Sequence, residues 1–134
     1  LFEPASINER FFLAQNAGRL FWHRPFLGWG WGSFIPAQGQ LGLSRGSFNF
    51  YQPVHNLFLL VLAEAGLWGL LCFFFWLAKW WLKVSYYLRH LFLVIAFLGF
   101  FDHYWLTLQQ NFLLLGVVIA IALSTSEVER GEVV

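Results

Sequence analysis

Charged side chains are scarce in this chain of 134 residues. They make up 11% of the sequence, against about 25% in an average soluble domain. Hydrophobic residues make up 59%, against about 45–50%. A soluble domain of this size needs more polar side chains to cover its surface. The composition therefore argues against a soluble domain, a disordered chain and a nucleic-acid-binding protein, which needs a basic face, and it favours a membrane protein.

Cysteine and methionine are also nearly absent. The single cysteine, Cys72, excludes an internal disulfide and a multi-cysteine metal site. Cys72 lies in an apolar run, so we expect a buried, unreactive thiol. The chain begins at Leu1 and contains no methionine. We therefore expect a processed protein or a piece of a longer one, and the lack of a signal peptide carries no information.

Two long stretches have almost no charge, and they predict the membrane-spanning helices. Glu64 is the one charge in 46–78, and Asp102 is the one charge in 90–126. A helix needs about 20 apolar residues to cross a membrane, so the second stretch is too long for one crossing. A turn near Asp102 would divide it, although a single long tilted helix is the alternative because the turn has no strong sequence signal. We expect three spans, at about 57–78, 86–101 and 106–123.

The basic residues predict how these spans are oriented. Lys79, Lys83 and Arg89 lie in the connection between the first two spans, and the positive-inside rule places this connection in the cytoplasm. Residues 1–55 are then extracytoplasmic, residues 56–123 form the membrane region, and the tail 124–134 returns to the cytoplasm as a frayed, solvated segment. The sequence thus predicts an all-α, multi-pass integral membrane protein that is a fragment of a larger helical bundle.

Four arginines in residues 1–55 oppose this orientation: Arg10, Arg19, Arg24 and Arg45. A segment of this length nears the limit at which the positive-inside rule stops counting charges, which is the simpler explanation. The alternative is that some of these arginines bind an anion.

A short amphipathic helix is expected at about 7–23. Ser6 and Glu9 have the spacing of a capping box, and Pro25 would end the helix. Helical spacing puts several residues on one face, where small alanines leave room beside Arg10 for a bulky partner: Arg10, Ala14, Ala17, Phe21 and Arg24. The alternative is a helix that lies on the membrane surface with its arginines among lipid phosphates.

The next segment is rich in glycine. Residues 28–32 alternate glycine with tryptophan, which predicts a turn-rich entry to a loop rather than a dinucleotide-binding motif. Residues 35–53 are expected to form a loop over a site. Glu64 lies inside the first span, nine residues from His55 and on the opposite face. We therefore expect Glu64 to pair with another helix.

Several motifs together resemble the C-terminal core of the O-antigen ligase and polymerase superfamily. His55 and Asn56 are followed after nine residues by Gly66 and Gly69. The run from Pro25 to Phe34, with Gly28, Gly30 and Gly32, precedes them, and Arg10 and Asp102 occupy matching positions. The resemblance covers about residues 8–123.

The resemblance implies a multi-pass enzyme of the inner membrane that acts in cell-envelope polysaccharide biosynthesis. Such enzymes transfer a glycan from an undecaprenyl-diphosphate carrier to an acceptor hydroxyl at the outer face of the membrane. The acceptor is a glycolipid in the lipopolysaccharide ligases, another glycan in the polymerases, or a protein hydroxyl. The resemblance implies no metal, no cofactor and no nucleic-acid partner, and it implies further N-terminal helices.

The residues suit this chemistry. Arginine grips phosphate oxygens in pairs, so Arg10 is the first candidate to stabilise the departing diphosphate, with Arg24 and Arg45 as lesser candidates for substrate binding. His55 is expected to accept the proton of the acceptor hydroxyl, because the pKa of an ordinary histidine is about 6.5. Asp102 could orient His55 or the acceptor, balance the charge of the arginines, or simply be a solvated acid at a helix end. Asn56 could contact backbone or sugar.

A second reading is a non-catalytic membrane module, such as a transporter or scaffold piece, that binds lipid headgroups through the outer arginines. In that reading His55 and Asn56 only cap a helix at the interface. The sequence gives His23 and His103 no partners, and both are expected to lie at the membrane interface.

Overall fold

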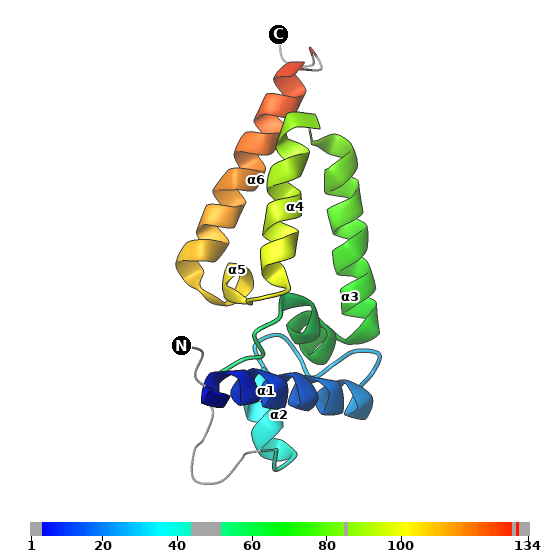
Figure 1. Ribbon diagram of the computed structural model, residues 1–134. Coiled ribbons are helices and arrows are strands. Elements are labelled where there is room, and N and C mark those ends of the chain that lie inside the picture. The colour runs from blue at the N-terminus through cyan, green and yellow to red at the C-terminus, as the bar shows by residue number, and fades with distance from the viewer. Residues whose placement is uncertain (1–3, 44–51, 85, 130, 132–134) are drawn as a thin grey trace.

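The computed structural model describes residues 4–43, 52–84, 86–129 and 131, and this part of the chain is helical without any β-strand. The predicted all-α class is thus confirmed. The helices are α1 (Pro4–His23), α2 (Phe34–Gln40), α3 (Leu57–Lys83), α4 (Tyr86–Gly99), α5 (Tyr104–Thr107) and α6 (Gln109–Glu129). Figure 1 shows α1, α2 and the start of α3 packed together at the lower end, with the rest of α3, α4 and α6 extending away from them.

Helix α1 begins earlier than the sequence predicts. It starts at Pro4, where the fixed φ angle of proline suits the first turn of a helix. Ser6 therefore lies inside the helix, and the predicted capping box at Ser6 and Glu9 is wrong. The helix ends at His23, close before Pro25, as predicted.

The core lies where α1, α2 and the first turns of α3 meet. Its buried members come from all three helices and from the segment before α3: Leu13, Ala17, Leu20, Phe34, Ala37, Val54, Leu60 and Ala63. Asn16 and Gln38 are also buried, and Asn16 Nδ2 donates to Gln38 Oε1 at 2.8 Å. This hydrogen bond ties α1 to α2, because a polar pair in a core stabilises only when its members bond to one another.

Helix α3 is broken at Gly66, which has φ 67° and ψ −168°. The glycine-rich loop inserts at this break. Trp29 N donates to the Ala63 carbonyl at 3.2 Å, and Gly30 N donates to the Glu64 carbonyl at 2.8 Å. These carbonyls would otherwise accept from the next turn of α3.

Two further hydrogen bonds run in the opposite direction, from amides of α3 to carbonyls of the loop. Leu67 N donates to the Pro25 carbonyl at 2.8 Å, and Trp68 N donates to the Phe26 carbonyl at 3.2 Å. The loop thus satisfies the backbone groups that the break leaves open. Figure 1 shows the consequence, since the first turns of α3 point in a different direction from the rest of the helix.

The carboxylate of Glu64 holds the start of α2. Its Oε1 accepts from Phe34 N at 3.0 Å and its Oε2 accepts from Gly32 N at 2.9 Å. Phe34 is the first residue of α2, where a negative charge is favoured by the helix dipole. The expectation that Glu64 pairs with another helix is confirmed, and its partners are backbone amides.

One described helix, α3, is long and apolar enough to cross a membrane. Helix α4 has 14 residues, and the apolar part of α6 covers Gln109–Ala122. Helix α4 ends at Gly99 and α6 begins at Gln109, so the alternative of a single long helix is wrong. A Cβ at Gly99 would lie 3.1 Å from Leu57 Cδ2, so this glycine permits a close approach of α4 to α3.

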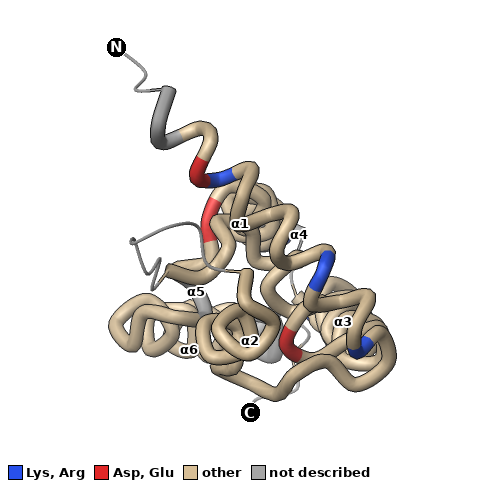
Figure 2. The backbone as a smooth tube through the Cα atoms, turned by 90° about the horizontal axis from the view of Figure 1, so that it is seen from below, with Lys and Arg blue, Asp and Glu red and all other residues tan. Residues whose placement is uncertain are grey.

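Three smaller expectations need correction. Residues 35–40 belong to helix α2 rather than to a loop. Helix α6 continues to Glu129, so residues 124–129 are helical rather than frayed. Cys72 is exposed on α3 rather than buried. Figure 2, a view from below, shows how few of the described positions are charged.

Candidate functional site

His55 lies immediately before α3, where Asn56 fixes the backbone. Asn56 is the N-cap of α3, and its Oδ1 accepts from Leu59 N at 2.9 Å. Its Nδ2 donates to the Phe100 carbonyl at 2.9 Å, just after the end of α4. Of the two predicted contacts of Asn56, the structure shows the backbone contact. Asn56 therefore links the start of α3 to the turn that carries Asp102.

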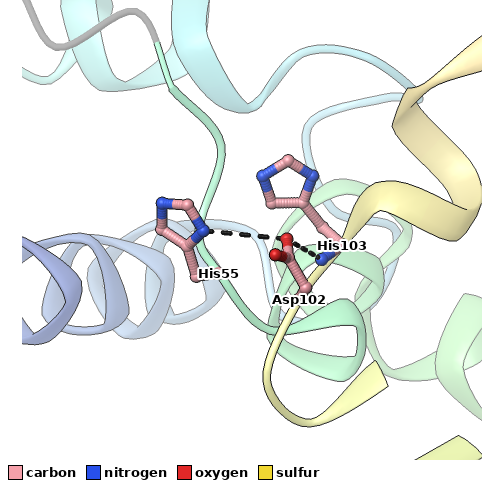
Figure 3. A group of neighbouring side chains, drawn as sticks. All are labelled: His55, Asp102 and His103. Atoms are coloured by element: carbon pink, nitrogen blue, oxygen red, sulfur yellow. Dashed lines mark hydrogen bonds and ion pairs between the residues drawn. The ribbon is translucent and has the colours of Figure 1, made fainter. Parts of the chain in front are cut away.

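His55, Asp102 and His103 form a cluster at this junction (Figure 3). The Nδ1 atom of His55 lies 3.7 Å from Asp102 Oδ1. Asp102 Oδ1 also accepts from His103 N at 2.8 Å. His55 Nδ1 is buried and has no hydrogen-bond partner within the described residues. Its nearest charged neighbour is thus a carboxylate, which could orient the imidazole after a small movement.

His103 is the member of this cluster that the sequence analysis misses. It is buried, and its ring centroid lies 5.4 Å from that of His55. Its Nδ1 is 2.7 Å from Thr107 Oγ1, and this hydroxyl donates to the His103 carbonyl at 3.3 Å. Because the Thr107 proton is used there, Nδ1 of His103 is assigned as the donor to Oγ1. The expectation that His103 is an isolated interfacial residue is wrong.

Burial lowers the pKa of His103. Desolvation of the ring is the largest cause, and the positive charge that His55 can carry acts in the same direction. The Asp102 carboxylate and a backbone hydrogen bond oppose the shift without cancelling it. The lowered pKa favours the neutral form of His103, in which Nε2 is the acceptor when Nδ1 carries the proton.

Arg10 and His55 line the same cavity of about 300 Å³. Arg10 comes from the exposed side of α1, and Ala14, one turn further along, also lines the cavity. Asn56 and several apolar side chains complete the described wall. The structure thus brings a guanidinium and an imidazole to one space, and the small side chain of Ala14 leaves it open.

Arg24, another predicted substrate-binding residue, is not placed in this cavity. The Arg24 guanidinium lies 4.3 Å from the centre of the Trp29 ring, a cation–π contact, and Arg24 is not among the described residues of the Arg10 cavity. Arg24 comes 14 residues after Arg10, about 21 Å along a helix at 1.5 Å per residue, so a shared helix face does not bring the two arginines to one cavity. Arg45 lies outside the described residues.

The histidine cluster also has the composition of a metal site. His55, Asp102 and His103 each offer one ligand atom, and these atoms lie within 4.8 Å of one another. Two imidazoles and a carboxylate suit Zn²⁺ among the common ions. The same atoms equally suit an acid–base group. Proton transfer at this cluster therefore does not require a metal ion.

Taken together, the site combines a guanidinium, an imidazole and a carboxylate at one end of the helices. A guanidinium stabilises a developing phosphate charge, and an imidazole beside a carboxylate accepts a proton from a hydroxyl. This set of groups suits the transfer of a group from a phosphate leaving group to a hydroxyl.

The comparisons with known proteins agree with this chemistry. No curated protein and no solved structure matches the chain. A family model described as O-antigen ligase matches residues 2–74. This range covers more than half of the chain and includes Arg10, the glycine-rich loop, His55 and the break at Gly66. The chain therefore belongs to the O-antigen ligase family.

Proposed function

We propose that this protein transfers a glycan from an undecaprenyl-diphosphate carrier to an acceptor hydroxyl at the outer face of the cytoplasmic membrane. The hydroxyl belongs to a glycolipid, another glycan or a protein. Family membership supports glycan transfer as the general activity. The observation that carries the proposal is that Arg10 and His55 line one cavity.

In the proposed reaction, the acceptor oxygen attacks the anomeric carbon of the glycan. A new carbon–oxygen bond forms while the bond between that carbon and the diphosphate oxygen breaks. The hydroxyl proton passes to the Nε2 atom of His55, and the diphosphate leaves with the bonding electron pair. Arg10 stabilises the negative charge that develops on the diphosphate, as its planar fork can bind two phosphate oxygens.

Asp102 and Asn56 are proposed to position His55. The Asp102 carboxylate faces Nδ1 at 3.7 Å, so a proton on Nδ1 would point toward Asp102 and leave Nε2 as the base. Asn56 fixes the backbone beside His55 through its two hydrogen bonds. We therefore assign Asn56 a positioning role, with its amide turned to backbone rather than to sugar.

We further propose that three helices cross the membrane: α3 beyond Gly66, α4 and α6. Residues 67–83 of α3 would span ~25 Å at 1.5 Å per residue, close to the lower limit for a crossing helix. Large apolar side chains are exposed on all three helices, among them Phe75, Phe97 and Val117. These side chains suit contact with lipid. Residues 1–55 and Asp102 then lie outside, and residues 124–134 lie in the cytoplasm.

The metal-independent form of the reaction is part of the proposal. Arg10 supplies the positive charge that a metal ion would otherwise bring to the diphosphate. The reactants are the lipid-linked glycan and the acceptor, with the membrane lipids as surroundings.

Substitutions in the intact protein, expressed in its native membrane, test the proposal. His55→Ala and Arg10→Ala should each lower glycan transfer by at least about 100-fold, the usual loss when a charge-stabilising or proton-accepting group is removed. The matched controls are His23→Ala and Arg19→Ala, because both residues are exposed on α1. Protein amounts in the membrane should be unchanged in all four variants.

Transfer that survives both His55→Ala and Arg10→Ala would overturn the proposal. It would then favour a non-catalytic module that binds lipid headgroups through its outer arginines. Loss of transfer in the control variants as well would show that any change on α1 disables the protein.

A further inference from the structure

A second cavity of about 250 Å³ adjoins the histidine cluster. Thr107 lines this cavity, and its hydroxyl lies 2.7 Å from His103 Nδ1. Trp31 from the glycine-rich loop and Glu64 from α3 form other parts of the wall. The cavity therefore lies one hydrogen bond from His103, whose ring is next to that of His55, the proposed base.

The charge of this wall favours a neutral ligand that donates hydrogen bonds. None of the described residues that line the cavity is basic, and Glu64 is 6% exposed. The Glu64 carboxylate accepts two backbone hydrogen bonds, from Gly32 and Phe34. A carboxylate can accept about four, so Glu64 has capacity for a hydroxyl donor. A phosphate would be repelled, which separates this cavity from the one beside Arg10.

The remaining polar and aromatic groups suit a sugar. Trp31 is 67% exposed, so its flat indole face is available to a ligand. The face of an aromatic ring carries partial negative charge and attracts the weakly positive C–H groups on the flat side of a pyranose. The Thr107 hydroxyl can bond to a hydroxyl at the sugar edge. An indole, a threonine and a carboxylate with spare capacity thus match the two kinds of surface that a sugar presents.

We propose that this cavity is a saccharide subsite that holds one neutral sugar unit against Trp31, with Thr107 and Glu64 contacting its hydroxyls. The inference rests on the proposed glycan transfer. The sugar belongs either to the glycan on the carrier or to the acceptor, since both have the same chemistry. Kinetics with each reactant varied separately distinguish the two sources.

The test uses Trp31→Ala and Thr107→Val in the intact protein, with Trp22→Ala as the matched control. Trp22 is 77% exposed on α1 and is not among the described residues that line either cavity. Trp31→Ala should raise KM for one reactant by about tenfold, and Thr107→Val by a smaller factor, while kcat changes little. A higher KM for the acceptor assigns the subsite to the acceptor, and a higher KM for the carrier-linked glycan assigns it to the donor.

Binding of the free oligosaccharide, followed by saturation-transfer difference NMR, supplies a readout that does not require transfer. The signal should be retained in His55→Ala and lost in Trp31→Ala. Unchanged KM values together with an unchanged signal in Trp31→Ala would overturn the subsite, even if His55→Ala abolishes transfer. Transfer that survives His55→Ala would instead overturn the proposed function, while the NMR result would still decide the subsite.

Discussion

Replacing Gly66 by alanine should straighten α3 and detach the glycine-rich loop from it. The φ and ψ angles of Gly66, 67° and −168°, belong to a region that is essentially restricted to glycine. Forcing alanine into it costs about 1–3 kcal/mol. The added Cβ would also overlap the Phe26 carbonyl and lie 2.6 Å from Gly28 N. Because these neighbours are backbone atoms, one of the two segments must move.

The movement breaks the four hydrogen bonds that join the loop to the break in α3. If the helix then continues through residue 66, the amides of Leu67 and Trp68 regain partners four residues earlier, at Ala63 and Glu64. The loop groups regain only water, so the net loss is about two hydrogen bonds, or ~1–3 kcal/mol. Because alanine at position 66 is then helical, the backbone strain is relieved and only the lost hydrogen bonds count, so the free energy of unfolding should fall by about 1–3 kcal/mol.

The measurements are thermal unfolding of the intact protein in detergent and hydrogen–deuterium exchange over residues 25–33. Exchange should rise in this segment, and transfer should fall because His55 is carried by the first turns of α3. Gly18→Ala in α1 is the matched control, since a Cβ there meets open space, and it should raise stability by about 0.5–1 kcal/mol. Equal stability and equal exchange in Gly66→Ala and Gly18→Ala would refute the reasoning.

The site supports three further predictions. Asp102→Asn should lower kcat for transfer by at least tenfold at unchanged membrane levels, because a neutral amide orients His55 less well; an unchanged kcat would remove Asp102 from the mechanism. The pKa of His103 is lowered by burial, so the unfolded chain binds a proton more readily than the folded chain does. The contribution of neutral His103 to stability should therefore be fully present above pH ~6.5 and decline as the pH falls below it. Denaturation followed against pH should lose this component in His103→Gln, and an identical profile in both proteins would contradict the burial argument. Chelation with EDTA should leave transfer unchanged, whereas added Zn²⁺ should inhibit by binding the histidine cluster, less strongly in His103→Gln; loss of transfer with EDTA would instead indicate a required metal.

Much of the helical layout could be predicted from the sequence, because hydrophobic runs and proline act locally. The end of α1 before Pro25 and the helix that follows His55 both agree with the structure. The break in α3 could not be predicted this way. A glycine inside an apolar run is normally tolerated in a helix, and Gly66 differs only because a distant loop docks against it.

The candidate site was predictable in part. The sequence analysis named both Arg10 and His55, and they line one cavity, although their roles stay predictions. Arg24 was predicted to share a helix face with Arg10, but the two are about 21 Å apart along the helix axis, so Arg24 does not reach the same cavity. His103 was missed because His55, its neighbour in the cluster, comes close only where the end of α4 meets the start of α3. Its position next to Asp102 in the sequence was the one available signal.

The break in α3 explains why the glycine-rich loop and His55 belong to one functional unit. The hydrogen bonds at the break set the direction of the first turns of α3 relative to the rest of the helix. His55 precedes those turns, and Asn56 ties them to the turn that carries Asp102. If α3 were straight, its start could not pack under α1 while its remainder runs beside α4. In the proposed mechanism the glycines therefore act through geometry, by allowing an arginine on α1 and a histidine before α3 to line the same cavity.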